Sequence, residues 1–162
     1  MDLEALLQNM TNMRDLHLAL VNISSSVPQS LANFSSLTSL SLSFCNLNGE
    51  FPNSIFHLPK IQVIDLSGNK FLTRFLTEFP YGSPLKQLQL SRTRFSGKLP
   101  SSIGNLKALN VLNLYLDQNQ LNGPLDFQNV SSNLKSPELG GNKLIELFPR
   151  PIANLSELYG LV

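Results

Sequence analysis

Residues 37–52 read LTSLSLSFCNLNGEFP, and residues 85–100 read LKQLQLSRTRFSGKLP. Both stretches place leucine at the first, fourth and sixth positions, glycine at the thirteenth and proline at the sixteenth. Successive units start near Met13, Leu37, Ile61, Leu85, Leu109 and Leu134, evenly spaced except for one extra position before the last. A nearly constant period of about 24 residues indicates a repeat architecture.

The alternation Leu40-Ser41-Leu42 predicts a short strand with one buried face, and similar alternations recur in register along the chain. A single coil cannot bury its own apolar face. Neighbouring coils must therefore stack on a shared core, with parallel strands about 4.8 Å apart.

The ninth position of each unit follows the strand, where the chain turns. Asn69, Asn119 and Asn142 occupy it in three units, and Cys45 and Thr93 in two others. An amide can donate to and accept from backbone groups of adjacent coils. These residues are predicted to form a buried structural ladder, with a structural and not a catalytic role for Cys45.

Composition excludes several classes of protein. The chain has 162 residues, 42% of them hydrophobic and only 14% charged, with a net charge of +1, which suits one repeat domain. Without a basic block there is no source for nucleic-acid affinity, and no apolar run of about 18 residues could span a bilayer. The N-terminal residues lack the features of a signal peptide. We expect no nucleic-acid partner and no membrane contact by this segment.

The pattern Leu-x-x-Leu-x-Leu-x-x-Asn-x-Leu-x-Gly-x-Ile-Pro resembles the plant-specific class of leucine-rich repeats, and the resemblance covers the whole chain. It implies an α/β repeat fold. The expected molecule is a right-handed curved leucine-rich repeat solenoid, with a parallel β-sheet on its concave face and short 3-10 or irregular convex segments. In this class a second short strand follows the first. Residues 1–162 would form one such domain of about six repeats, with partial repeats at both ends.

Three short segments resemble the wilt-resistance type of plant receptor-like proteins: residues 8–16 (QNMTNMRDL), 79–85 (FPYGSPL) and 101–106 (SSIGNL). Members of that group are cell-surface immune receptors with a large repeat ectodomain, one membrane span and a short cytoplasmic tail. The resemblance implies a place on the extracellular side of the plasma membrane. Because no cysteine-bearing cap or span is present, the chain is expected to be an internal ectodomain fragment.

Three units depart from the pattern. In the third, residues 73–76 (TRFL) replace Gly-x-Ile-Pro, which we interpret as a local loop variation. In the fifth, two extra residues mean that either the strand is extended or a bulge absorbs Tyr115-Leu116. In the sixth, Pro137 stands where a buried leucine belongs and should weaken the strand. The C-terminal third is either a drifted copy or a functional adaptation.

No constellation of residues predicts catalysis. His17 and His57 occupy unrelated positions in different units, so no set of metal ligands converges on either. The chain has no phosphate-binding glycine loop, paired carboxylates or nucleophile with its base. We predict a protein that is not an enzyme, without cofactor or metal site.

Five Asn-x-Ser/Thr sequons suit a secreted, glycosylated surface, although the repeat consensus itself generates some of them. They lie at Asn9, Asn22, Asn33, Asn129 and Asn154.

Outward-facing strand positions vary while the leucine positions do not, which is the anatomy of a binding surface on a regular scaffold. The predicted ligand-binding residues on the concave face are His17, Phe44, Asp65, Gln89, Arg92, Tyr115, Asp117, Gln118 and Glu138. Three hypotheses follow. The first is a cell-surface receptor segment that binds a protein or peptide, pathogen-derived ligands included, together with a co-receptor in plant defence. The second is a secreted inhibitor of a microbial cell-wall hydrolase, and the third is a non-functional gene fragment; the flanking sequence distinguishes them.

Overall fold

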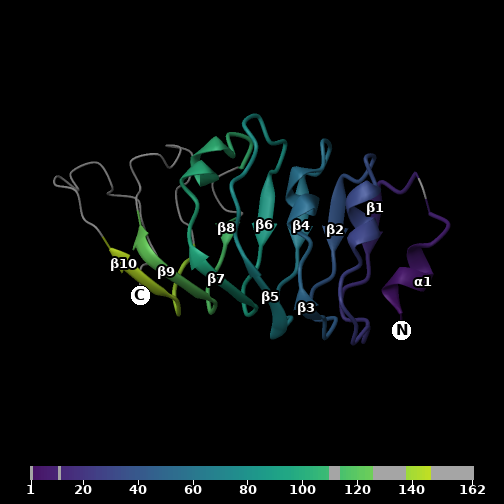
Figure 1. Cartoon of the computed structure of the whole chain (residues 1–162), viewed down its shortest axis with the longest axis horizontal. Helices are drawn as coiled ribbons and strands as arrows, with labels where there is room; N and C mark the ends of the chain where they lie inside the picture. The colour runs from purple at the N-terminus through teal and green to yellow at the C-terminus, as the bar shows by residue number, and fades with distance from the viewer. Residues whose placement is uncertain (1, 11, 110–113, 126–137, 147–162) are drawn as a thin grey trace.

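Two parallel sheets run side by side along the long axis of the molecule (Figure 1). The computed structural model describes residues 2–10, 12–109, 114–125 and 138–146. The first sheet contains β1 (Asp15–His17), β2 (Ser39–Ser41), β4 (Val63–Asp65), β6 (Gln87–Gln89) and β8 (Leu114–Tyr115). The second contains β3 (Asn48–Glu50), β5 (Phe71–Phe75), β7 (Arg94–Lys98), β9 (Gln120–Leu125) and β10 (Lys143–Glu146). The predictions of a leucine-rich repeat solenoid and of a second short strand are confirmed, although in the first coil this strand is reduced to an isolated bridge between Ser26 and Asn48.

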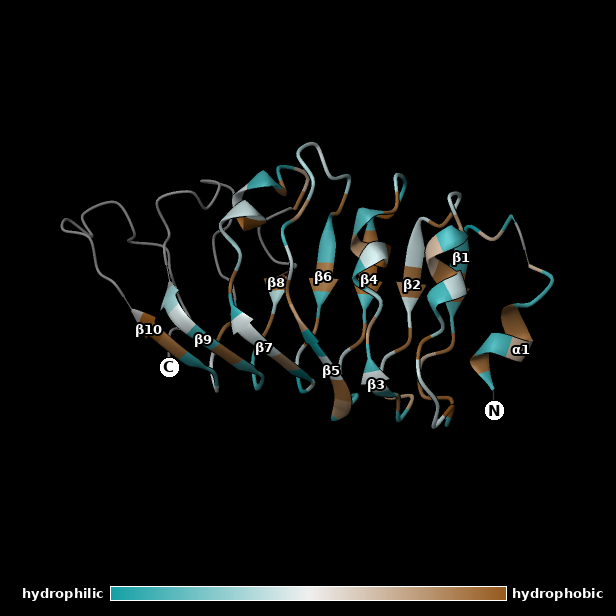
Figure 2. Cartoon of the chain, in the orientation of Figure 1, coloured by the Kyte–Doolittle hydropathy of each residue, from teal (hydrophilic) through white to brown (hydrophobic). Residues whose placement is uncertain are grey.

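The first sheet follows the sequence period. Leu16, Leu40, Ile64 and Leu88 hold the same position in four successive units, pair in register and are all buried. In Figure 2 the strand β6 shows an apolar band between polar ends, as this alternation requires. The leucine columns form one continuous core because each coil covers the apolar face of the next.

The fifth unit resolves an open question. Leu88 pairs with Leu114, and Leu114 and Leu116 are both buried. A bulge at Tyr115-Leu116 is therefore wrong, and the two extra residues precede Leu114. Among the described residues the sheet ends in an isolated bridge between Tyr115 and Glu138. Pro137, predicted to weaken the sixth strand, lies outside the described residues.

Short helices cover the opposite side where the sequence supplies a proline. The 3-10 helices η1 (Gln29–Asn33), η2 (Asn53–His57) and η3 (Ser101–Asn105) each follow a proline with φ between −66° and −72°. Proline fixes that φ and needs no donor at a helix start. The third unit has Leu76 in place of this proline, and its residues 76–86 contain no helix. An α-helix, α1 (Leu3–Leu7), which the repeat pattern did not predict, precedes the first coil and is capped by the Asp2 side chain.

In the third unit the second-sheet strand β5 is turned over relative to its neighbours. Gly49 of β3 pairs with Leu72, which lies one position before its repeat equivalent, Thr73, and the pairing with β7 is also shifted by an odd number of positions. An odd slip moves side chains to the opposite face of a sheet. Consequently Leu72 is buried, while Phe71 and Phe75 are 55% and 66% exposed. The predicted loop variation thus begins as a strand whose aromatic residues face outward.

Candidate ligand-binding surface

One column of side chains crosses the concave face from coil to coil. Strand pairing and the final bridge align, in order, His17, Ser41, Asp65, Gln89, Tyr115 and Glu138. The first five each stand between two inward-facing residues, and all six are at least partly exposed. Five of the nine residues predicted to bind ligand therefore share a single column, at about 4.8 Å per coil.

Phe44, Arg92 and Gln118 lie in a different column, at the edge where the chain leaves the first sheet in each coil. All three have φ between 53° and 57°, in the left-handed region. This conformation costs a residue with a side chain about 1 to 2 kcal/mol. Each backbone N–H donates to a carbonyl of the next coil, for example Arg92 to Asp117 at 3.1 Å. The turn thus presents these side chains at the rim of the concave face.

Phe44 is the aromatic residue of this rim. Its side chain is exposed, and its ring lies over Gly68 in the next coil. A Cβ atom on Gly68 would come within 2.5 Å of the ring, and Gly68 itself has φ +75°. The glycine therefore allows Phe44 to lie flat along the rim.

The concave carboxylates are partly satisfied by serine residues. Asp65 accepts hydrogen bonds from the Ser67 hydroxyl at 2.6 Å and the Ser67 backbone N–H at 3.0 Å. Asp117 accepts one from the Ser91 hydroxyl of the preceding coil. These contacts hold the two acidic groups in place on the concave face, where they remain partly exposed.

The ninth-position residues form the predicted ladder. The Asn119 amide nitrogen donates to the carbonyls of Leu90 and Leu116, at 2.7 and 3.1 Å. Its oxygen accepts from the Thr93 hydroxyl and the Phe95 N–H. Such contacts connect consecutive coils, because they satisfy buried backbone N–H and carbonyl groups that are not paired within the strands. These side chains belong to the scaffold that supports the binding surface.

Cys45 takes part in the same ladder. Its thiol is fully buried and donates to the carbonyl of Leu18 at 2.9 Å. Burial raises the pKa of the Cys45 thiol, although backbone hydrogen bonds from Val21 and Leu20 act in the opposite direction. A thiol with these properties is a poor nucleophile near neutral pH.

We therefore expect Cys45 to resist iodoacetamide in the folded chain and to react only after unfolding. Mass spectrometry of labelled protein with and without urea measures this directly. Complete labelling of the folded chain within the time that an exposed cysteine peptide needs would contradict the buried structural role.

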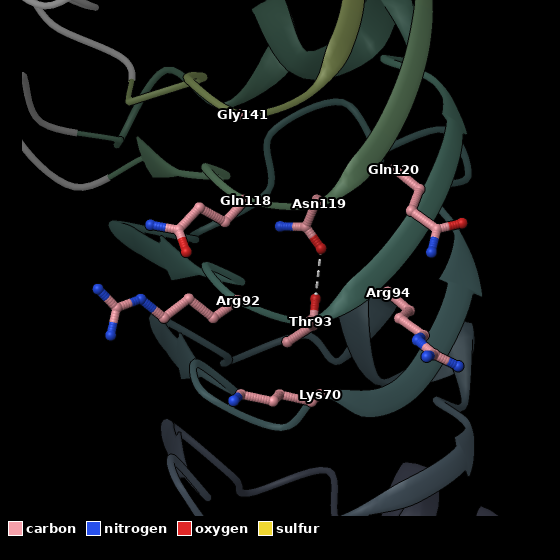
Figure 3. Close-up of a pocket in the computed structure, with 8 residues that line it drawn as sticks. All are labelled: Lys70, Arg92, Thr93, Arg94, Gln118, Asn119, Gln120 and Gly141. Atoms are coloured by element: carbon pink, nitrogen blue, oxygen red, sulfur yellow. Dashed lines mark hydrogen bonds between the residues drawn. The ribbon is translucent and has the colours of Figure 1, made fainter.

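An open groove of about 540 Å³ lies beside the rim (Figure 3). Its lining includes two of the residues predicted to bind ligand, Arg92 and Gln118. The other lining residues were not predicted to bind ligand: Lys70, Arg94, Gln120 and Gly141, and the ladder residues Thr93 and Asn119. Lys70, Arg94 and Gln120 each occupy the tenth position of their unit. That recurrence was visible in the sequence. The alternation of a strand, however, does not predict in which direction a side chain points once the chain has left the first sheet.

The two histidines and the described sequons lie outside the groove. His17 lies 2.7 Å from the Ser39 hydroxyl through its Nε2 atom, and His57 is exposed. Within the described ranges no three His, Cys, Asp or Glu side chains gather as metal ligands, and no helix could cross a membrane. Asn9, Asn22 and Asn33 are exposed, whereas the sequons at Asn129 and Asn154 lie outside the described residues.

Comparison with known proteins places this geometry in context. The Leucine Rich Repeat family matches residues 36–58 and 84–106. Receptor-like protein 6 of Arabidopsis thaliana is 36% identical over 112 residues, covering 69% of this chain and 11% of the relative. Receptor-like protein 9DC1 of Solanum pimpinellifolium is 33% identical over 123 residues, covering 75% and 14%. The chain thus spans only about a tenth to a seventh of these curated relatives.

Solved structures give the same picture. The plant peptide hormone receptor RGFR1 in complex with RGF2 superposes with a TM-score of 0.78 at 32% identity, covering 97% of this chain and 25% of the receptor. The Arabidopsis receptor kinase HAESA, in complex with the peptide hormone IDA and the co-receptor SERK1, gives 0.73 at 28% identity, covering 90% and 24%. Leucine-rich repeat receptor-like proteins and the repeat ectodomains of receptors are ligand-binding and non-catalytic, so the prediction that this chain is not an enzyme is confirmed.

Proposed function

Because the chain belongs to the leucine-rich repeat proteins and is of the plant receptor-like type, we propose that it is part of the ligand-recognition surface of a plant cell-surface receptor. The observation that carries this is the outward column from His17 to Glu138. It places imidazole, hydroxyl, carboxylate, amide and phenol groups in line on a rigid parallel sheet. A varied column on an invariant scaffold is suited to reading a protein or peptide surface.

The comparisons support a class of partner. RGFR1 and HAESA are seen with peptide hormones, and HAESA with a co-receptor, which supports a peptide or protein ligand and a co-receptor for the receptor that contains this chain. The curated relatives are receptor-like proteins, which favours a receptor over a secreted hydrolase inhibitor. The receptor would act on the extracellular side of the plasma membrane, with glycans on exposed sequons such as Asn33.

A finer part of the proposal concerns biological role. The resemblance to wilt-resistance receptor-like proteins supports a function in disease resistance and defence signalling, with a pathogen-derived ligand. Elicitor responses in plants that express a receptor with this segment, compared with plants that lack it, test that role. A receptor that responds only to an endogenous peptide hormone would remove the defence assignment and leave the recognition function in place.

In a receptor ectodomain carrying this segment, Tyr115→Ala is expected to weaken ligand binding by about 1 to 3 kcal/mol, because tyrosine residues at the centre of an interface contribute strongly. Gln89→Ala in the same column should weaken it less. Biolayer interferometry against the immobilised ligand measures both.

The matched controls are Lys60→Ala and Lys107→Ala, which remove exposed side chains adjoining η2 and η3. They should leave affinity unchanged. Loss of binding in the two lysine variants, with retention in Tyr115→Ala, would assign recognition to the convex side and refute the proposal.

A further inference from the structure

The groove beside the rim is cationic. Of its eight lining residues three are Lys70, Arg92 and Arg94, and the lining contains no aspartate or glutamate. All three cations are exposed. The only ion pair in the described part of the chain joins Arg74 of β5 to Glu50 of β3, so it involves none of the three. Three like charges without a counter-ion create a positive potential that an anionic group would neutralise.

One of these cations is held in position through its side chain and a second through its backbone. Arg94 lies over the ring of Phe71, with 5.5 Å between its guanidinium carbon and the ring centroid. Arg92 is fixed at its backbone by the left-handed turn and by its N–H donating to Asp117. In Figure 3 the side chain of Gln118 extends to the same side of the groove as Arg92, and that of Gln120 to the same side as Arg94, so each side of the groove has an amide donor. Pre-positioned guanidinium groups bind carboxylates more strongly than mobile ones, since less freedom is lost.

An exposed aromatic ring adjoins the cations. Phe71 occupies a repeat position that is normally a buried leucine, and it is 55% exposed because β5 is turned over. Leaving a phenylalanine on the surface forgoes about 1.5 to 3 kcal/mol of burial. Departures from a local rule of this kind concentrate at functional sites.

We propose that this groove binds an acidic segment of the protein ligand, with carboxylates at Arg92 and Lys70 on one side of the groove and at Arg94 on the other, and with a neighbouring apolar side chain on Phe71. This rests on the proposed recognition function and extends it, because it places part of the ligand beyond the concave columns. Asp65 and Asp117 lie on the adjoining concave face and would repel a long polyanion. A short acidic and apolar peptide segment therefore fits better than a polyuronate chain.

A designed peptide probe tests the groove on the full chain. The probe is a fluorescent, acetylated and amidated peptide of alternating glutamate and leucine, and fluorescence polarisation reports its affinity. Arg92→Gln and Arg94→Gln should each weaken binding about tenfold. Both changes are mild, because Gln118 and Gln120 occupy the same repeat positions in the next coil. Lys107→Gln removes an equal charge outside the groove and should have no effect.

Two phenylalanine variants of the same strand test the proposed apolar contact. Phe71→Ala should weaken binding of the glutamate–leucine peptide severalfold, because the apolar contact is lost and Arg94 is no longer held over the ring. Binding of a glutamate–serine peptide, which lacks the apolar contact, should weaken clearly less. Phe75→Ala removes an equally exposed ring from the same strand, where it covers Gly97 and not the groove, and should change neither. Circular dichroism melts establish that every variant is folded.

Three outcomes would overturn the inference. The first is that a lysine–leucine peptide binds as tightly as the glutamate–leucine peptide. The second is that Lys107→Gln weakens binding of the acidic peptide as much as Arg94→Gln does. The third is that oligogalacturonate binds more tightly than the acidic peptide. The natural ligand separates this inference from the proposed function. If Tyr115→Ala weakens ligand binding and Arg94→Gln does not, recognition stands and the groove assignment fails; if neither does, both fail.

Discussion

Replacing Asn69 by alanine is expected to lower the free energy of unfolding by about 3 to 5 kcal/mol. The side chain is fully buried, and its amide nitrogen donates to the carbonyls of Leu42 and Leu66 at 2.8 and 2.7 Å. Its oxygen accepts from the N–H groups of Cys45 and Leu47, both at 3.0 Å. Alanine leaves these buried groups without this partner, and each costs about 1 to 3 kcal/mol. Urea denaturation followed by circular dichroism measures the loss.

Two variants separate this effect from a general loss of volume. Asn69→Thr should cost less, because a threonine hydroxyl in this repeat position lies within hydrogen-bond distance of the carbonyl three residues before it, as Thr93 does at 2.8 Å from the Leu90 oxygen. Asn142→Ala should also cost less, because Asn142 makes similar contacts but is only half-buried, so that water can replace them. Equal losses for Asn69→Ala and Asn142→Ala would show that the ladder acts by packing and not by satisfying buried backbone groups.

Phe51→Ala should be comparably destabilising, by about 3 to 5 kcal/mol. Phe51 is fully buried, and its ring centroid lies 5.2 Å from that of Phe56 and 6.2 Å from that of Phe95. Phe79 extends the cluster at 5.7 Å from Phe56. Alanine would open a cavity where three coils meet, because a solenoid core cannot collapse around it without shifting whole coils.

Thermal unfolding of Phe51→Ala, Phe51→Leu and Phe75→Ala tests this. Phe51→Leu should cost less, since Leu99 occupies the same repeat position two units later. Phe75→Ala removes the same side chain from the unit between them, where it is exposed, and should change stability little. A loss for Phe75→Ala as large as that for Phe51→Ala would contradict the reversed facing of β5.

Much of the scaffold could be predicted from local patterns. Alternation at Leu40 and Leu42 implied a half-buried strand, and the constant repeat period implied that equivalent strands pair in parallel, as they do. Polar residues at the ninth position implied a ladder, since an amide placed between coils meets unpaired backbone groups on both sides. Proline at the sixteenth position coincides with every 3-10 helix described.

The candidate site was predicted only in part. The column from His17 to Glu138 follows from the alternation of faces along a strand, so sequence was sufficient for it. Arg92 and Gln118 were recognised as outward-facing, but not as the wall of a groove. Lys70, Arg94 and Gln120 were missed, because their facing depends on how far the chain turns between the two sheets.

The sequence by itself determined the repeat, the parallel first sheet, the buried leucine columns and the outward column, because each depends on a period that one coil shares with the next. Only the tertiary structure decided that Leu114 and not Leu112 pairs with Leu88, and that Phe71 and Phe75 face outward where Phe51 is buried. Both depend on register between coils, which is chosen by the total pairing and packing of adjacent strands. For Phe71 and Phe75 the alternative registers differ by one residue and present opposite faces of the strand. For Leu112 and Leu114 they differ by two residues and bury the same face, so the alternation of the sequence does not distinguish them.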